Sequence, residues 1–258
     1  MTLIPGFERR RRISKQIASL IRKREEHRGL LIAFEGPDGS GKTTQRKLFK
    51  QWLHSEGHQV TTTKWNSSAL IKPVTKARKQ VRALSAEEFC LLHASDFRYR
   101  MDSEILPALW DGTTVVADRY LFTALARDAA RGLELDWLLK VYSPLFWPDL
   151  VFYFSVTPET SSQRIAADRD PSYYEAGQDI TQIENPLQSY RTFITRVIAE
   201  YEALAGIFKF VTIDAEQSVY DQHRLIRSIF EKVERRSWAE WNQEALVDWL
   251  VQHPRLAV

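Results

Sequence analysis

Residues 30–44 read LLIAFEGPDGSGKTT, an apolar run that leads into a glycine-rich turn and then into the start of a helix. Gly36, Gly41, Lys42 and Thr43 match the pattern G-x-x-x-x-G-K-[ST] of a phosphate-binding loop. Glycines let the backbone curl so that several N–H groups point at one anion, and a helix that begins near Lys42 adds the positive end of its dipole. This stretch therefore predicts a polyphosphate site.

The flanks of this loop have the secondary structure that the pattern requires. Residues 30–34 are apolar like a buried strand, and residues 48–53 carry apolar side chains at helical spacing. In such a loop Lys42 reaches the β and γ phosphates of ATP, and the Thr43 hydroxyl holds Mg²⁺. The residues that we expect to bind ATP are Gly36, Pro37, Asp38, Gly39, Ser40, Gly41, Lys42, Thr43 and Thr44.

The composition fits a globular intracellular protein. With 258 residues, 44% of them hydrophobic, the chain can form one α/β domain with additions or two small domains. No run of about 18 apolar residues predicts a membrane span, and the N-terminus does not read as a secretory signal. A single cysteine, Cys90, excludes an internal disulfide, so we expect a cytoplasmic protein.

The positive charge is concentrated at the front of the chain. Residues 1–28 hold nine Lys and Arg and three acidic residues, a net +6 against +3 for the whole, so the remainder carries −3. This segment predicts a basic amphipathic helix. Binding to nucleic acid or to an anionic membrane is one interpretation, but the apolar stripe is short, and we favour a helix packed on the domain.

Strand-like segments alternate with helix-like segments through the rest of the chain. After the first strand we expect strands over Gln59–Trp65, Thr113–Ala117, Leu150–Val156 and Phe208–Ile213. This alternation predicts an α/β fold with a five-stranded parallel sheet and helices on both faces. Ligands then bind at the carboxyl ends of the strands, where Asp118 follows one strand close to the phosphate loop.

Helix signals mark the other segments. Ser85-x-x-Glu88 is a capping box that starts a long helix, which should end or kink near Pro107. Asn185-Pro186 starts another helix, and residues 66–80 read as a polar connection. A last helix over 236–258 carries Trp238, Trp241 and Trp249, which we expect to pack against the same chain.

Several motifs outside the phosphate loop are more specific than the loop itself. They are FEGPDGSGKTTQ (Phe34 to Gln45), Asp118-Arg119-Tyr120, Pro148-Asp149-Leu150, SAEEFCLLHAS, ILPAL (Ile105 to Leu109) and Arg164-Ile165. In these the chain resembles the thymidylate kinase family of nucleoside monophosphate kinases over roughly residues 30–215. The resemblance implies the P-loop NTPase fold, with ATP and Mg²⁺ used to convert dTMP to dTDP, and a homodimer.

The resemblance also implies a role for individual residues. Asp38 would approach the sugar of the acceptor nucleotide, Arg119 would clamp its phosphate, and Asp118 would lie by Mg²⁺ or the acceptor. Members of the family supply an arginine to the transferred phosphoryl group from the loop or from a mobile lid. Because Gly39 follows Asp38 here, the lid must supply it, and the candidates are Arg164 and Arg169.

The acceptor pocket departs from the family pattern. Where the family has a phenylalanine that stacks on thymine and an arginine that reads it, this chain has His93 and Phe97, with Arg98 next to them. Arg127 and Asp128 stand where the family faces the base, either as base-edge contacts or as a structural ion pair. The acceptor-binding residues that we expect are Asp38, Trp65, His93, Phe97, Arg98, Arg119, Tyr120, Arg127 and Asp128.

This reading divides the chain into three parts and has two competitors. The parts are a helical extension over 1–28, a kinase domain over 29–235 with a lid around 164–184, and a C-terminal helix over 236–258. A deoxynucleoside kinase, with Glu35 as its base, is one alternative. A nucleotide-binding module without turnover is the other, although an intact Lys42 argues against it.

Overall fold

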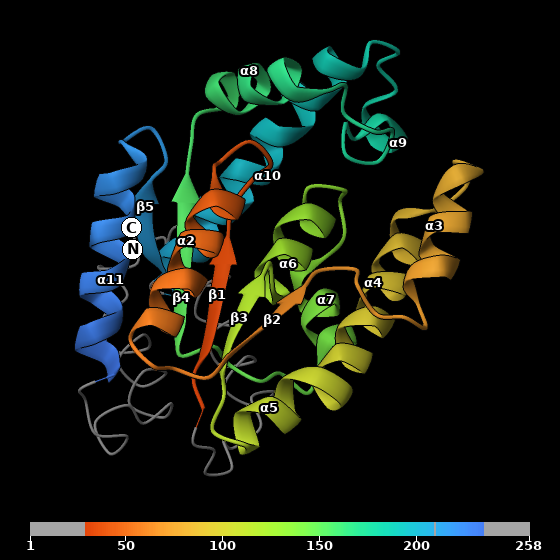
Figure 1. Ribbon diagram of the computed structural model, residues 1–258. Helices are drawn as coiled ribbons and strands as arrows, with labels where there is room; N and C mark the ends of the chain where they lie inside the picture. Colours follow the sequence, from red (N-terminus) through yellow and green to blue (C-terminus); the bar gives the residue numbers. More distant parts are fainter. Residues whose placement is uncertain (1–28, 209, 235–258) are drawn as a thin grey trace, which may run out of the picture.

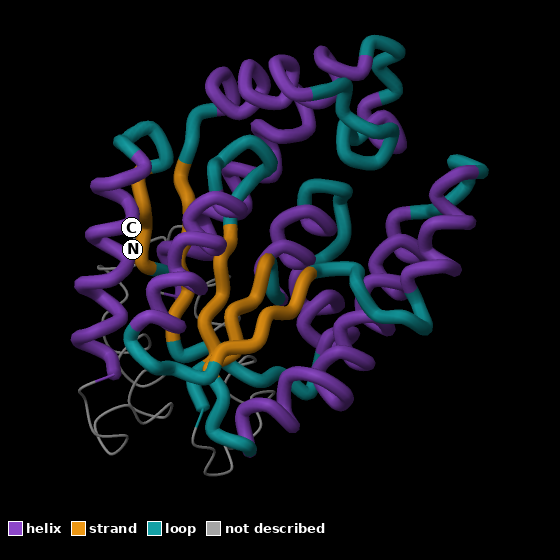
Figure 2. The backbone as a smooth tube through the Cα atoms, viewed as in Figure 1, coloured by secondary structure: helices purple, strands orange, loops and turns teal. Residues whose placement is uncertain are grey.

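The computed structural model of the protein describes residues 29–208 and 210–234, which form a central sheet with helices packed on both faces (Figures 1 and 2). All five strands are parallel, in the order β2-β3-β1-β4-β5. The strands are β1 (Leu31–Glu35), β2 (Val60–Lys64), β3 (Thr114–Asp118), β4 (Leu150–Ser155) and β5 (Val211–Asp214). The predicted α/β fold with a five-stranded parallel sheet is therefore confirmed, and β1 lies at its centre.

Helices connect successive strands, as a parallel sheet requires. They are α2 (Lys42–Ser55), α3 (Lys72–Gln80), α4 (Ala86–Arg100), α5 (Leu106–Trp110), α6 (Leu121–Ala129), α7 (Leu135–Tyr142), α8 (Pro158–Asp168), α9 (Gln178–Thr181), α10 (Pro186–Phe208) and α11 (Val219–Glu234). All strands point the same way, so their carboxyl ends form one edge. In Figure 1 that edge lies at the top, below α8.

Alternate residues of the central strand pack into two separate cores. Leu31 and Ala33 face a large core made with α4, α6, α7 and α10. Ile32 and Phe34 face a smaller core with α2 and α11, where Phe49 and Phe230 meet with ring centroids 5.3 Å apart. A strand buried on both faces reads as a continuous apolar run, which is how the sequence of β1 reads.

The predicted capping box starts α4. The Ser85 side chain accepts a hydrogen bond from the Glu88 backbone N–H, and the Glu88 side chain accepts one from the Ser85 N–H. Such a cap contributes about 1 kcal/mol to helix stability. The helical chain continues through a π-helical turn, η1 (Met101–Ile105), into α5, which contains Pro107. The predicted kink near the proline is therefore accommodated by widening the helix.

Two secondary-structure predictions were wrong. Residues 66–80, read as a polar connection, contain α3. Its sequence lacks the apolar stripe that marks a core helix, because only Thr75 is buried in it. Strand five begins at Val211 rather than Phe208, because Phe208 ends α10 and packs against Phe122 in the large core.

Other predictions fall beyond the described residues. The helices expected over 1–28 and 236–258, with their basic and tryptophan-rich faces, lie outside the part of the chain that the structure describes. Within residues 29–208 and 210–234, none of the helices has the length and apolar character needed to cross a membrane.

Candidate active site

The phosphate-binding loop spans the carboxyl end of β1 and the first turn of α2, at the edge where all strands end (Figure 1). Two of its glycines are required by space as well as by backbone angle. Gly36 has φ +137°, and a Cβ there would lie 2.7 Å from the Phe154 carbonyl oxygen. Gly39 has φ +73°, and its Cβ would lie 2.8 Å from the Ser161 oxygen. Neighbouring backbone therefore packs directly against the loop and fixes its curl.

Lys42 points back over this loop and is buried. Its Nζ donates to the Pro37 carbonyl and lies 3.2 Å from the Ser40 Oγ. Burial, together with the nearby charge of Arg119, lowers the pKa of the Lys42 ammonium to about 7. Because its hydrogen-bond partners are neutral loop atoms, the ammonium lies where a bound polyphosphate would supply the missing negative charge.

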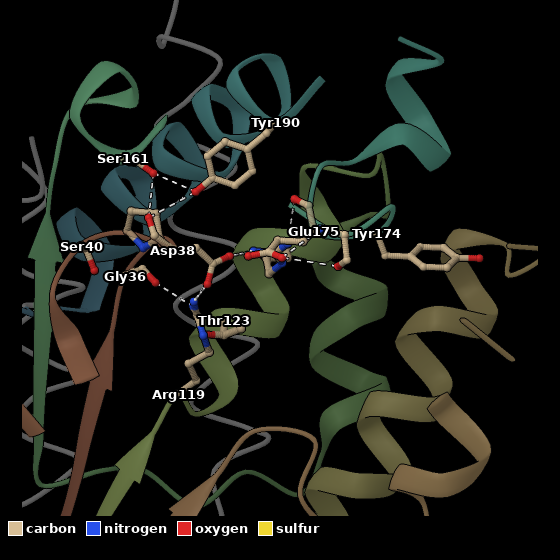
Figure 3. A network of polar contacts seen from close by, with 12 residues as sticks. Gly36, Asp38, Ser40, Arg119, Thr123, Ser161, Tyr174, Glu175 and Tyr190 are labelled. Carbon is tan, nitrogen blue, oxygen red and sulfur yellow. Dashed lines mark hydrogen bonds and ion pairs between the residues drawn. The ribbon is translucent and has the colours of Figure 1, made fainter. Parts of the chain in front are cut away.

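A carboxylate between two guanidinium groups forms the centre of the site (Figure 3). The Asp38 carboxylate accepts hydrogen bonds from Arg119 and, at 2.9 Å, from Arg127. Burial alone would raise the pKa of Asp38, but the charges of Arg119, Arg127 and Lys42 hold it well below its usual value. Burial would likewise lower the pKa of Arg119, yet Asp38 raises it. Both groups therefore stay charged beside the phosphate loop.

Arg119 is held in place by its own backbone. It follows β3 in the left-handed region with φ +68°, which is uncommon for a residue with a side chain. Its N–H donates to the Phe34 carbonyl at 3.0 Å, and its guanidinium donates to the Gly36 carbonyl at 2.7 Å. The strained backbone and these bonds direct the cation to the loop.

Glu35 supports this turn from beneath. It is fully buried at the end of β1 and accepts hydrogen bonds from the Tyr120 N–H at 2.7 Å, the Thr123 hydroxyl at 2.6 Å and the Tyr201 hydroxyl at 3.0 Å. Burial raises the pKa of its carboxyl. Since its oxygens are occupied by protein donors, Glu35 fixes the backbone that follows Arg119 and has no access to a ligand.

The loop is also braced from the side by two hydroxyl groups. Ser161 on α8 donates to the Asp38 carbonyl at 2.7 Å, and the Tyr190 hydroxyl on α10 lies 3.3 Å from the same oxygen (Figure 3). The two hydroxyls are 2.8 Å apart. This brace joins the loop to the helices on either side of the lid.

The two candidate magnesium ligands lie at the same edge. Asp118 ends β3, and its carboxylate is 3.3 Å from the Arg46 Nε on α2. Thr43 stands exposed in the first turn of α2, and the described part of the chain gives its hydroxyl no hydrogen bond. Within residues 29–208 and 210–234 no three His, Cys, Asp or Glu side chains gather as a metal site.

The lid candidates differ in their surroundings. Arg164 on α8 donates to the Gly39 carbonyl at 3.2 Å and to the Ala215 carbonyl at 3.1 Å, so it ties the phosphate loop to the segment after β5. Arg169 lies beyond α8 and makes a two-pronged ion pair with Glu175, with distances of 2.8 and 2.7 Å. Its side chain is 49% exposed, and the hydrogen-bonded Glu175 carboxylate raises the pKa of Arg169, with a smaller contribution from Asp38.

The segment after Arg169 connects α6 to the start of α4, across the space between these helices and the phosphate loop that we call the cleft. The Glu175 carbonyl accepts from Arg127 at 3.4 Å (Figure 3). The Tyr174 hydroxyl accepts from the Leu84 N–H at 3.0 Å, just before α4. The Tyr174 ring also packs on Phe89, with centroids 5.4 Å apart. The lid therefore spans from the P-loop side to the start of α4.

Three predicted acceptor residues form one aromatic group on the far side of the cleft. Trp65, which follows β2, stacks on His93 with rings 6.0 Å apart and 11° from parallel, and it contacts Phe97 at 5.9 Å. Burial lowers the pKa of His93 well below its ordinary value, and the positive charge of Lys79 makes a smaller contribution in the same direction. His93 is therefore a neutral ring within this wall.

Three other predicted residues point elsewhere. Arg98 donates to the Pro144 carbonyl at 3.0 Å, and the Tyr120 hydroxyl donates to the Phe146 carbonyl at 2.7 Å within the core. Asp128 is buried beside Tyr142, and burial raises its pKa to about 6. The structural ion pair considered for Arg127 and Asp128 does not form, because Arg127 bonds Asp38 instead.

Residues that the sequence did not single out complete the site. They are Arg46, Lys79, Arg131, Ser161, Glu175 and Tyr190. Arg46 follows Lys42 by four positions on α2, so helical spacing could have placed it on the same face. The others come from five separate segments of the chain, and no local pattern links them to the loop.

Comparison with known proteins agrees with this geometry. A family model described as "Thymidylate kinase" matches residues 34–226. A protein of Saccharolobus solfataricus named "Probable thymidylate kinase 2" is 41% identical over 205 residues, which cover 78% of this chain and 95% of that protein. A "Probable thymidylate kinase" of Pyrococcus abyssi is 33% identical over 203 residues (76% and 93%). A "Thymidylate kinase" of Bacillus velezensis is 30% identical over 219 residues (80% and 99%).

Proposed function

The chain belongs to the thymidylate kinase family, and on this premise we propose that it transfers the γ-phosphoryl group of ATP to dTMP, which gives dTDP. The observation that carries the proposal is the arrangement of Lys42, Asp38 and Arg119. The Lys42 ammonium lies over the phosphate loop, and the Arg119 guanidinium reaches the same loop from the end of β3, the strand that pairs with β1. One binds the donor triphosphate and the other the acceptor phosphate, so that the two anions meet at the sheet edge.

The chemistry requires little beyond this arrangement. A phosphate monoester is already anionic at neutral pH, so its oxygen can attack without a strong general base. The charge that develops on the transferred group is stabilised by Lys42 from the loop and by an arginine from the lid. The lid over the cleft, tied to α4 by Tyr174, excludes the water that would otherwise hydrolyse ATP.

Mg²⁺ fits the residues at this edge. Magnesium in kinases is held by one or two protein oxygens together with substrate phosphates and water, and Thr43 and Asp118 offer two such oxygens beside the loop. When bound, Mg²⁺ would neutralise charge on the β and γ phosphates of ATP. Arg46 lies on the Asp118 carboxylate and would hold it in position.

The state of Glu35 argues against a deoxynucleoside kinase. That activity needs a base for a sugar hydroxyl, but the Glu35 carboxyl is fully buried and bound by Tyr120, Thr123 and Tyr201. No comparison favours a module without turnover either, and Lys42 and Arg119 are both in place.

An ADP-release assay over nucleosides and their monophosphates tests the proposed activity. We expect ATP consumption with dTMP and none with thymidine, because Arg119 binds a phosphate that a nucleoside lacks. Activity with the nucleoside alone would support the competing kinase class and refute our assignment. A chelator such as EDTA should abolish turnover, and added Mg²⁺ should restore it.

We propose that Arg169 is the lid arginine that reaches the transferred phosphoryl group. It is half-exposed and bonds only within the lid, to the Glu175 carboxylate and the Asp170 carbonyl, whereas Arg164 donates to carbonyls of the phosphate loop and of the segment after β5. Substituting Arg169→Ala should lower kcat about 100-fold with little change in the KM for ATP. Substituting Arg164→Ala should mainly raise the KM for ATP. Steady-state kinetics of both variants would contradict this assignment if the two effects were exchanged.

We propose a homodimer that forms through an exposed stripe on α4 and on the π-helical turn η1 that continues it. Leu91, Ser95, Tyr99 and Ser103 follow at intervals of four, and both serine hydroxyls bond back to carbonyls of their own helix at 2.9 and 2.6 Å. Leu91 and Tyr99 are exposed. With its hydroxyls satisfied, the stripe offers an uncharged face to a second copy.

Light scattering on a sizing column tests the dimer. The wild type should elute at twice 30.0 kDa, and Tyr99→Glu should elute as a monomer because the carboxylate would be buried without a partner. Tyr220→Glu is the matched control, since Tyr220 is an exposed tyrosine on α11, away from the stripe. A monomeric wild type, or a Tyr99→Glu dimer, contradicts the proposal.

The wider setting of the protein is also part of the proposal. We retain the division into an extension over 1–28, a kinase domain over 29–235 with a lid around 164–184, and a C-terminal helix over 236–258. The bonds of Tyr174 to Leu84 and of Glu175 to Arg127 support that lid. A free buried Cys90 and the use of ATP agree with work in the cytoplasm.

A further inference from the structure

Lys79 places an ammonium group inside the cleft without a carboxylate partner. It lies in the last turn of α3, with its Nζ 3.4 Å from the His93 Nε2 and 4.6 Å from the centre of the Phe89 ring. Within residues 29–208 and 210–234 no acidic oxygen comes within 4.0 Å of it. A partly buried lysine normally pairs with an acid, so this one has binding capacity to spare.

The bond to His93 has a definite direction. The His93 Nδ1 lies 2.7 Å from the Phe89 carbonyl oxygen, and because a carbonyl only accepts, Nδ1 carries the hydrogen. The ring is buried and neutral, so Nε2 offers a lone pair, and Lys79 donates to it. His93 therefore fixes the ammonium in position and leaves its other N–H groups for a ligand.

Two further cations approach the same space from α6 and the residues just after it. The Arg131 guanidinium carbon lies 4.4 Å from the centre of the Phe89 ring, which the Lys79 ammonium also contacts. Arg127 lies four residues before Arg131, on α6. Both arginines have a carboxylate, Asp179 for one and Asp38 for the other, each within 2.9 Å. Asp128 and Asp179 also act on the charge of Lys79, but among the described residues neither carboxylate forms an ion pair with it, so its remaining N–H groups are available to an electron-rich ligand atom.

The position of Lys79 relative to the phosphate loop identifies that ligand atom. Asp38 bonds both Arg119 and Arg127, and Arg131 donates to the Arg127 carbonyl at 3.1 Å, so the cations extend outward from the loop. Figure 3 shows this direction, from Ser40 through Asp38 to Tyr174. If the phosphate of a nucleotide binds at Arg119, its sugar would lie beside Asp38 and its base would extend toward Lys79.

We propose that Lys79 donates a hydrogen bond to the base of the acceptor nucleotide and selects a keto oxygen at the ring position opposite the sugar. His93 is the positioning residue that orients it. An ammonium only donates, so it pairs with the 4-keto oxygen of thymine and opposes the 4-amino group of cytosine. This inference rests on the proposed function, because it assumes that the acceptor is a nucleoside monophosphate bound at Arg119.

The test compares dTMP with dCMP at saturating ATP. We expect Lys79→Met to lower the ratio of kcat/KM for dTMP to that for dCMP about 10- to 100-fold, chiefly through the KM of dTMP. If dCMP is not turned over, its inhibition constant replaces kcat/KM. Lys76→Met is the matched control, because Lys76 is an exposed lysine on the same helix. It should leave the ratio, and the KM for ATP, unchanged.

The role of His93 is tested by His93→Phe, alone and with Lys79→Met. The phenylalanine keeps an aromatic ring but removes the Nε2 acceptor, so the dTMP to dCMP ratio should fall and should fall no further in the double variant. Melting temperatures show which variants fold. A ratio unchanged by Lys79→Met, or equal losses for both nucleotides, overturns the inference. A wild type inactive on every monophosphate would refute the proposed function instead.

Discussion

Replacing Lys42 by alanine should lower kcat by about a thousandfold or more while the protein remains folded. The ammonium is the cation of the phosphate loop, and it has to meet charge that develops on the transferred group. The pKa of Lys42 is lowered by burial and by the charge of Arg119, so the folded protein holds this ammonium at a cost in stability. Removing the charge should therefore leave the melting temperature unchanged or raise it, since functional groups are often held at the expense of stability. Single-turnover kinetics and thermal unfolding check both expectations.

Lys47→Ala is the matched control for this variant. Lys47 lies on the same helix, α2, but is exposed, so its loss should change neither kcat nor the melting temperature. Near-normal turnover in Lys42→Ala would refute the assigned chemistry. A large fall in melting temperature would instead show that Lys42 is a structural residue.

The second large effect is expected for Arg119→Ala, in which the acceptor KM should rise and kcat should fall while ATP binding is retained. Arg119 is the cation that faces the loop from β3, and its removal leaves the Asp38 carboxylate with Arg127 as its remaining cationic partner within 4.0 Å among the described residues. Removing one preorganised donor from an active site costs about 2.7–4 kcal/mol of transition-state stabilisation, so kcat/KM for dTMP should fall about 100- to 1000-fold. Steady-state kinetics with each substrate varied in turn measures the effect.

Arg119→Lys separates charge from geometry. A lysine keeps the positive charge but cannot donate to Asp38 and the Gly36 carbonyl with one planar group, as Arg119 does. It should therefore recover only part of the lost activity. If ATP affinity, measured by calorimetry, fell in Arg119→Ala while the acceptor KM stayed constant, the acceptor pocket would have been misplaced.

Local signals were sufficient for most of the framework. The apolar run before the loop predicted β1, the Ser85 and Glu88 pair predicted the start of α4, and Asn185 caps α10 by accepting from the Gln188 N–H at 3.0 Å. α3 was missed because it is nearly all exposed and has no apolar face to produce a period. Propensity and periodicity detect a helix by the face that it buries, so an exposed helix leaves little trace.

The sequence by itself determined the phosphate loop, the parallel sheet and the family, because each depends on residues that are close together in the chain. The tertiary structure alone decided what Asp38 binds, why Glu35 is no base and that Lys79 reaches His93. Those contacts join residues 14 to 166 positions apart. Their distances depend on how the helices pack against the sheet, and no local period encodes that packing.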